Sequence, residues 1–101
     1  FKQGDISKDE VLELSGLHIA EMVTIIVRYD NLQIPQPFVS AVKLFKLSAE
    51  TQLESDKYML EWVSTGDITA HVRSDQLIHQ SFQYEQAALY EFELQLRNAN
   101  P

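Results

Sequence analysis

Five consecutive β-branched residues, VTIIV at 23–27, place the strongest constraint on how this chain can fold. Such side chains lose χ1 freedom in a helix and pack well on a pleated surface. The segment MVTIIVRYD at 22–30 therefore predicts a strand, in which Val23, Ile25 and Val27 would share one face.

A polar segment with two prolines, DNLQIPQP at 30–37, follows this run. Pro35 and Pro37 lack the backbone N–H that a central ladder requires, so the segment predicts a turn or crossover. The apolar stretch FVSAVKLFKLS at 38–48 then predicts a second strand. Ser48 suits the N-cap of a short helix over the next residues.

The second half of the chain shows two further strand patterns. Apolar residues alternate on both sides of Thr65-Gly66-Asp67, so 57–74 predicts a β-hairpin. LYEFELQLR at 89–97 alternates strictly between apolar and polar residues, as in a half-exposed antiparallel strand. We therefore expect a mainly β protein, a small antiparallel β-sandwich with short helical additions.

A helical interpretation of the C-terminal part stays open. Five apolar residues fall on one helical stripe, interrupted only by Glu85: Ile78, Phe82, Leu89, Phe92 and Leu96. Three glycines and three prolines are also few for an all-β domain of 101 residues. The sequence alone does not decide whether 78–97 is strand or helix.

The N-terminal part carries a helix-start signal. SKDE at 7–10 fits a capping box with Ser7 as the N-cap, and Gly16 suits the end of a short helix. VLEL at 11–14 fits a short strand equally well. We expect 1–101 to form a single β-sandwich domain, with 1–21 as a possible helical N-terminal extension.

Net charge and composition limit the classes of partner that this chain is expected to bind. Fifteen acidic and eight basic residues give a net charge of -7, which disfavours nucleic acid and anionic membrane surfaces. A protein partner with a basic patch is better matched. No cysteine is present for disulfides or thiolate metal sites, and no apolar run is long enough to span a bilayer.

No catalytic or metal-binding pattern is recognised. His18, His71 and His79 lack a ligand spacing, and no serine sits in a G-x-S-x-G elbow. The glycines form neither a phosphate loop nor a dinucleotide fingerprint. We predict that the chain is not an enzyme and has no catalytic residues, cofactor or metal.

The stretch from 23 to 47 resembles the periplasmic outer-membrane lipoprotein subunit of the type VI secretion membrane complex. The likeness rests on an Asp-x-Leu-x-x-Pro turn, on a proline before a valine-rich segment, and on an aromatic-x-Leu ending. These features lie at Asp30, Leu32, Pro35, Pro37, Val39, Val42, Phe45 and Leu47.

The resemblance implies a transthyretin-like β-sandwich with a scaffolding role. Such a subunit lies at the periplasmic face of the outer membrane, where a lipid anchor upstream of this segment would hold it. Its partner would be another protein subunit of a larger assembly. The alternative is a β-sandwich interaction module of another assembly, whether viral, adhesive or multidomain.

The loop 30–37 is the predicted docking surface. It is polar, lacks glycine and is stiffened by two prolines, so it would lose little entropy on binding. We predict that Asn31, Leu32, Gln33 and Gln36 contact a protein partner. The alternative is a plain connection whose prolines protect a sheet edge.

Overall fold

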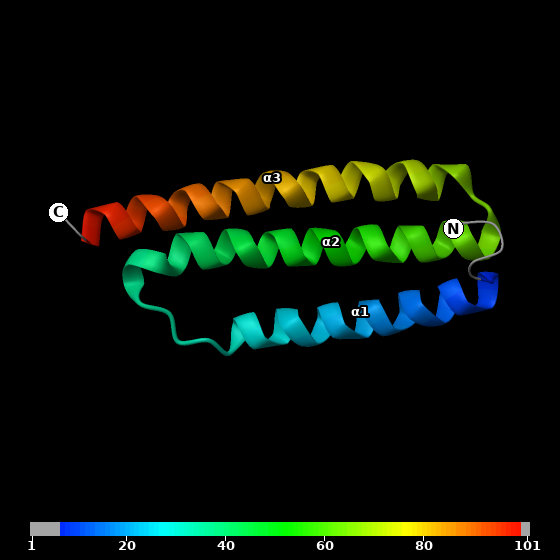
Figure 1. Cartoon of the computed structure of the whole chain (residues 1–101), viewed down its shortest axis with the longest axis horizontal. Coiled ribbons are helices and arrows are strands. Elements are labelled where there is room, and N and C mark those ends of the chain that lie inside the picture. Colours follow the sequence, from blue (N-terminus) through cyan, green and yellow to red (C-terminus); the bar gives the residue numbers. More distant parts are fainter. Residues whose placement is uncertain (1–6, 100–101) are drawn as a thin grey trace.

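Every regular element in the described part of the chain is a helix (Figure 1). The computed structural model describes residues 7–99. α1 spans Lys8–Asp30, the short 3-10 helix η1 spans Gln36–Phe38, α2 spans Val39–Thr65 and α3 spans Ile68–Ala99. α2 lies between α1 and α3 in a bundle 55 Å long and 24 by 22 Å across (Figure 1).

The expected β-sandwich is therefore wrong. The predicted strand at 22–30 lies in α1, 38–48 lies in η1 and α2, and 89–97 lies in α3. A β-branched residue costs a helix only up to about 0.7 kcal/mol relative to alanine. Burial of apolar side chains against neighbouring helices outweighs that local preference.

α1 begins where the sequence predicts a helix but does not stop at Gly16. Ser7 is confirmed as its N-cap, since the Ser7 hydroxyl accepts a hydrogen bond from the Glu10 backbone N–H at 3.2 Å. The least exposed positions recur every three or four residues and end with Met22, Ile26 and Tyr29. This spacing gives α1 one continuous stripe that packs on α2.

The proline-bearing connection is present, but it joins two helices. Asn31 caps α1 with its side-chain amide, which donates to the Val27 carbonyl at 3.1 Å. Pro35 is the N-cap of η1, and Pro37 lies in its first turn, where the missing N–H costs nothing. The prolines therefore start a helix and do not protect a sheet edge.

The predicted hairpin at 57–74 is a helical hairpin. Its turn is where the sequence placed it, because Gly66 adopts φ 76° and donates its N–H to the Trp62 carbonyl at 2.7 Å. Asp67 then accepts a hydrogen bond from the Thr69 N–H at 2.9 Å and starts α3. The helical interpretation of 78–97 is confirmed, and the strand at 89–97 is wrong.

Small residues line the contact between α2 and α3. Each helix presents three buried small side chains at intervals of seven residues: Ala41, Ser48 and Ser55 on α2, and Ser74, Ser81 and Ala88 on α3. The contact between α1 and α2 uses larger side chains such as Met22. α2 and α3 therefore form the closely packed hairpin of the domain.

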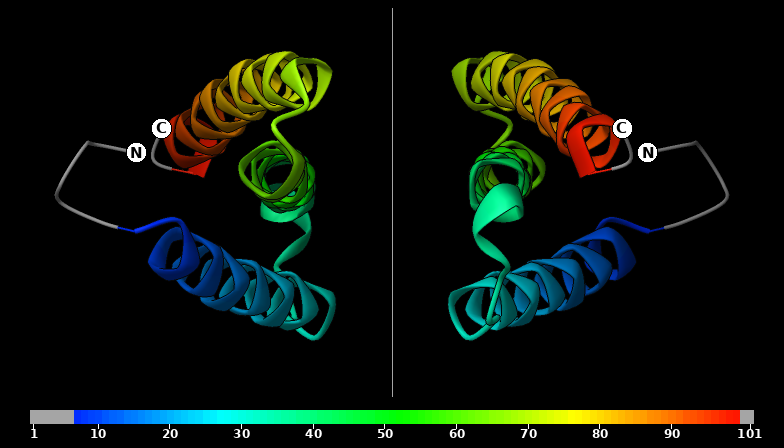
Figure 2. Two further views of the ribbon diagram at one scale, coloured as in Figure 1. Left: turned by 90° about the vertical axis from the view of Figure 1, so that its right-hand side faces the viewer. Right: turned by 90° about the vertical axis from the view of Figure 1, so that its left-hand side faces the viewer.

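α1 and α3 both pack on α2 but not on each other (Figure 2). Within residues 7–99, no Cα atoms of α1 and α3 approach within 8 Å. Seen along the bundle, the three helices form a V with α2 at its corner (Figure 2). In the same range, no helix combines the length and apolarity needed to cross a membrane.

Candidate functional site

The side of the V between α1 and α3 is the candidate functional site, and we call it the inner face. A hollow of about 240 Å³ lies at its centre, with walls from all three helices. Ile25 and Tyr29 contribute from α1, Phe45 and Gln52 from α2, and Glu85 from α3. The hollows place seven residues on the inner face: Leu14, His18, Ile25, Gln52, Asp56, Met59 and Glu85. Helical spacing from Glu85 puts Ile78, Phe82, Leu89 and Phe92 on the same side of α3, and Glu21 lies at the α1 edge of the face with Ile25.

A second hollow of about 240 Å³ continues this face along α1 and α2. Leu14 and His18 line it from α1, and Asp56 and Met59 from α2. Residues spaced by four or eleven positions lie on one side of a helix, which places Leu14 and His18 beside Ile25. The two hollows therefore belong to one surface.

The α3 wall of the inner face is the apolar stripe noted in the sequence. Phe82 is 53% exposed, Leu89 is 48% exposed and Phe92 is 38% exposed, so the stripe is only partly covered in this chain. The Phe92 ring packs on Phe38 with 5.1 Å between ring centres, which closes one end of the stripe. Contiguous exposed apolar surface of this kind marks interaction sites.

The outer side of α2 differs sharply in character. Five of its exposed residues are charged: Lys43, Glu50, Glu54, Lys57 and Glu61. Leu47 is exposed on this side as well. These residues form a solvated surface, with an ion pair of 3.6 Å between Lys57 and Glu54. The outer side of α2 is therefore richer in charged residues than the inner face.

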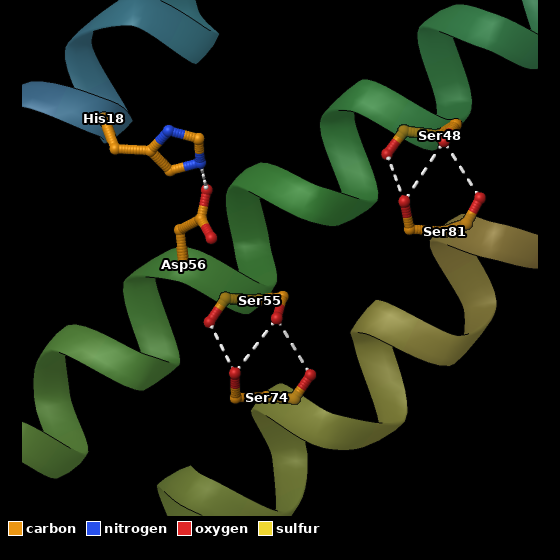
Figure 3. Close-up of polar contacts among 6 residues, drawn as sticks. All are labelled: His18, Ser48, Ser55, Asp56, Ser74 and Ser81. Atoms are coloured by element: carbon orange, nitrogen blue, oxygen red, sulfur yellow. Dashed lines mark hydrogen bonds and ion pairs between the residues drawn. The ribbon is translucent and has the colours of Figure 1, made fainter. Parts of the chain in front are cut away.

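Two reciprocal serine pairs hold α3 against α2 (Figure 3). The Ser55 hydroxyl donates to the Ser74 carbonyl at 2.9 Å, and the Ser74 hydroxyl donates to the Ser55 carbonyl at 2.9 Å. Ser48 and Ser81 repeat the arrangement one heptad away. All four serines are buried, and each hydroxyl donates to a carbonyl of the opposite helix. Each buried hydroxyl in this polar seam is therefore hydrogen-bonded.

One ion pair links α1 to α2 on the inner face. His18 Nε2 lies 2.8 Å from Asp56 Oδ2 (Figure 3). Burial raises the pKa of the Asp56 carboxyl, while the neighbouring imidazole of His18 works in the opposite direction. Asp56 Oδ2 is itself buried, and among the described residues His18 is its one ion-pair partner.

The His18–Asp56 pair does not define a catalytic centre. Ser15 lines the same hollow, but within residues 7–99 no hydrogen bond joins it to His18. His18 Nε2 faces Asp56, and no described serine hydrogen-bonds to its other ring nitrogen, so a Ser-His-Asp triad is not formed there. The absence of enzymatic activity stays a prediction.

The three histidines lie apart. His18 faces Asp56, whereas His71 lies 3.6 Å from Asp75 and packs on the Trp62 ring with 4.5 Å between ring centres. Among the described residues, no group of three or more His, Cys, Asp or Glu side chains is placed to hold a metal ion.

The predicted docking residues lie in and beside the connection from α1 to α2, at one end of the bundle. Asn31, Leu32, Gln33 and Gln36 are all exposed, and Leu32 is 54% exposed. Asn31 also serves as a helix cap, which is a structural role. Their part in partner binding stays a prediction.

Sequence reasoning missed the serine seam. Ser48 was predicted to cap a helix, but it lies inside α2 and bonds to Ser81, so that prediction is wrong. A signal was present in the sequence, because small residues recur every seven positions in both helices. That spacing predicts two helices in close contact.

Comparisons of the chain with protein-family models, curated proteins and solved structures give no match in any of the three. They therefore do not bear on the resemblance to the type VI secretion subunit. The residues that carry this resemblance lie in α1, in the connection after it, in η1 and in α2, so the β-sandwich that it implied is wrong.

Proposed function

We propose that this chain is a non-catalytic protein–protein interaction domain that accepts a helical segment on its inner face. The observation that carries the proposal is the hollowed, largely apolar surface shared by α1, α2 and α3, with Phe82 and Leu89 partly exposed on the α3 side. In four-helix bundles, a fourth helix covers such a surface. Docking of an amphipathic helix in an apolar groove is a recurring mode of protein recognition.

The dimensions suit a helix. α1 has 23 residues, so both walls run alongside each other for roughly 34 Å at about 1.5 Å per residue. α1 and α3 are both antiparallel to α2 and therefore run in the same direction (Figure 1). A docked helix antiparallel to both would have its macrodipole opposed to theirs, which is favourable.

The two walls, α1 and α3, are held to α2 by different contacts. The α2–α3 hairpin is held by the serine seam, whereas α1 contacts only α2 among the described helices. A rigid hairpin provides a preformed surface, which lowers the entropy lost on binding. We therefore expect α1, more than α3, to shift relative to α2 when a segment docks.

A role in the type VI secretion membrane complex, and a location at the periplasmic face of the outer membrane, stay predictions of the sequence resemblance. A lipidation cysteine upstream of Phe1 in the parent chain would support them. A parent chain without one would count against them. The interaction proposal does not depend on that outcome.

A helical peptide without charge tests the proposed function. Its length would match the 23 residues of α1, with leucines on one face and Gln and Ser on the other. We expect saturable binding to the wild-type chain by fluorescence anisotropy. Phe82→Ser and Leu89→Ser should each weaken binding about tenfold, which corresponds to the loss of roughly 1.4 kcal/mol of apolar contact.

Matched controls lie on exposed apolar residues outside the inner face. Val27 is 51% exposed and Tyr90 is 66% exposed, so Val27→Ser and Tyr90→Ser should leave affinity unchanged. Circular dichroism would verify that each variant stays helical. The proposal fails if the wild-type chain does not bind the peptide, or if the control variants weaken binding as much as the inner-face variants.

A further inference from the structure

We infer that the segment docked on the inner face is a basic amphipathic helix of another protein. This inference rests on the proposed function and adds the chemistry of the partner. Three carboxylates line the hollows of the inner face and its α1 edge: Glu21, Asp56 and Glu85. They are distributed over all three helices, so any occupant of the face meets them.

Glu85 is the most informative of the three carboxylates. It is the one charged residue within the apolar stripe of α3, and it lines the central hollow together with Ile25 and Phe45. It is exposed in this chain and therefore hydrated. A helix laid over the stripe would remove that water, and burying a carboxylate is costly unless a cation pairs with it.

Along the α1–α2 part of the face, a docked helix would likewise need a cation to pair with the carboxylate of Asp56. Its buried Oδ2 has His18 as its one ion-pair partner among the described residues, and the carboxyl group is already partly desolvated. A covering helix with a lysine or arginine near Asp56 would stabilise the charged form. An acidic or purely apolar helix would lack this compensation.

Among the described lysines and arginines, only Arg28 lines one of these hollows, together with Glu21. Lys46 pairs with Asp30, Lys8 donates to the Ser64 carbonyl at 3.4 Å, and Arg97 lies 3.9 Å from Glu93. Lys43 and Lys57 lie on the outer side of α2. Arg28 lies near the end of α1, at the edge shared with Glu21.

Charge also argues against a second copy as the occupant. Each copy carries a net charge of -7, and two inner faces would bring the same carboxylates together. Like charges brought together across an interface disfavour association. Opposite charge on a partner helix would both steer its approach and stabilise the docked state.

Three peptides with the same leucine face test the inference. The polar face carries lysine in the first, glutamine in the second and glutamate in the third. At about 50 mM NaCl we expect the lysine peptide to bind about tenfold more tightly than the glutamine peptide, and the glutamate peptide more weakly than both. The advantage of the lysine peptide should shrink at about 500 mM NaCl, where screening is strong.

Two double variants, each of which removes two carboxylates, show which side of the domain contributes to lysine-peptide binding at equal net charge. Glu21→Gln with Glu85→Gln removes two inner-face carboxylates. Glu13→Gln with Glu61→Gln removes two from outer positions, since Glu13 lies opposite Met22 and Glu61 opposite Gln52 on their helices. The first variant should weaken lysine-peptide binding about three- to tenfold, and the second should leave it unchanged.

The outcomes separate the two proposals. If the glutamine peptide binds but the lysine peptide binds no more tightly, the charge inference is overturned and the docking proposal stands. If neither peptide binds, both fail. Sedimentation equilibrium that shows a dimer of the wild-type chain, converted to monomer by Phe82→Ser, would overturn the choice of a basic partner.

Discussion

Ser48 and Ser81 each donate a side-chain hydrogen bond to the backbone carbonyl of the other, at 2.9 Å and 3.1 Å (Figure 3). A serine side chain is short, so these bonds form only where the two helix backbones lie in close contact. Ser55 and Ser74 repeat the geometry seven residues along each helix. The seam therefore fixes both the register and the separation of α2 and α3.

The change in stability caused by a substitution in the seam should depend on the size of the new side chain more than on its polarity. Ser48→Ala removes one hydrogen bond and keeps the small side chain, so we expect a loss of about 1 kcal/mol in the free energy of unfolding. Ser48→Leu adds volume between two close backbones and should cost about 3 kcal/mol. Ser40→Leu, at an exposed position of α2, should have little effect. Urea denaturation of the three variants would contradict a close seam if Ser48→Leu were as stable as Ser40→Leu.

The two described glycines should respond in opposite ways to alanine. Gly16 lies in the interior of α1, and an added Cβ would meet no atom within 4 Å, so Gly16→Ala should stabilise the chain by about 1 kcal/mol. Gly66 has φ 76°, and Gly66→Ala should destabilise it by about 1 kcal/mol or more because a Cβ is disfavoured there. Thermal unfolding of both variants would check this, and a shift of the same sign in both would contradict it.

Asp56 should make stability depend on pH. Burial raises the pKa of its carboxyl in the folded state, so folding favours the protonated form. The stabilising contribution of the protonated group is complete below the ordinary Asp pKa of 3.8 and is lost as pH rises through the raised value. The nearby imidazole of His18 opposes this effect without reversing it.

Asp56→Asn removes the charge and keeps an oxygen that can accept from His18 Nε2–H. We therefore expect this variant to match or exceed the wild-type melting temperature at pH 7, and to lose that advantage as pH falls below 4. Melting curves of both chains across this range would measure the difference. A variant that is less stable at pH 7, with a deficit that shrinks on acidification, would show that the ion pair outweighs burial.

Part of the fold was present in the sequence as local signals. The N-cap at Ser7, the turn at Gly66 and the proline-bearing connection all occur where the sequence placed them. Each depends on a few neighbouring residues and on fixed backbone geometry. The helices between them depend on contacts that lie far apart in the chain.

The strand predictions failed because β-branched residues were weighed by local preference alone. Val23 and Val27 are about half exposed in α1, while Met22, next to Val23 in the sequence, is buried. The spacing of buried positions, and not the type of residue, decides the structure here. The apolar stripe of 78–96 on the inner face can be recognised in the sequence. Its position relative to Ile25 depends on how the three helices pack.

The predicted docking loop can be tested with the same peptides. Leu32→Ala with Gln33→Ala changes two exposed residues and should leave the melting temperature nearly unchanged. Asn31→Ala removes a cap bond to Val27 and should cost about 1 kcal/mol. If the loop contacts the docked helix, the double variant should raise the dissociation constant at least about threefold. Unchanged affinity would identify the loop as a connection only.

Mapping the amide chemical shifts of the labelled chain, with and without the lysine peptide, tests most directly whether the inner face binds a helix. We expect the largest changes at Ile25, Gln52, Glu85 and Leu89, which line all three sides of the face. Amides at the outer residue Glu61 should not shift. Changes confined to the outer side of α2, or no change at saturating peptide, would contradict docking on the inner face.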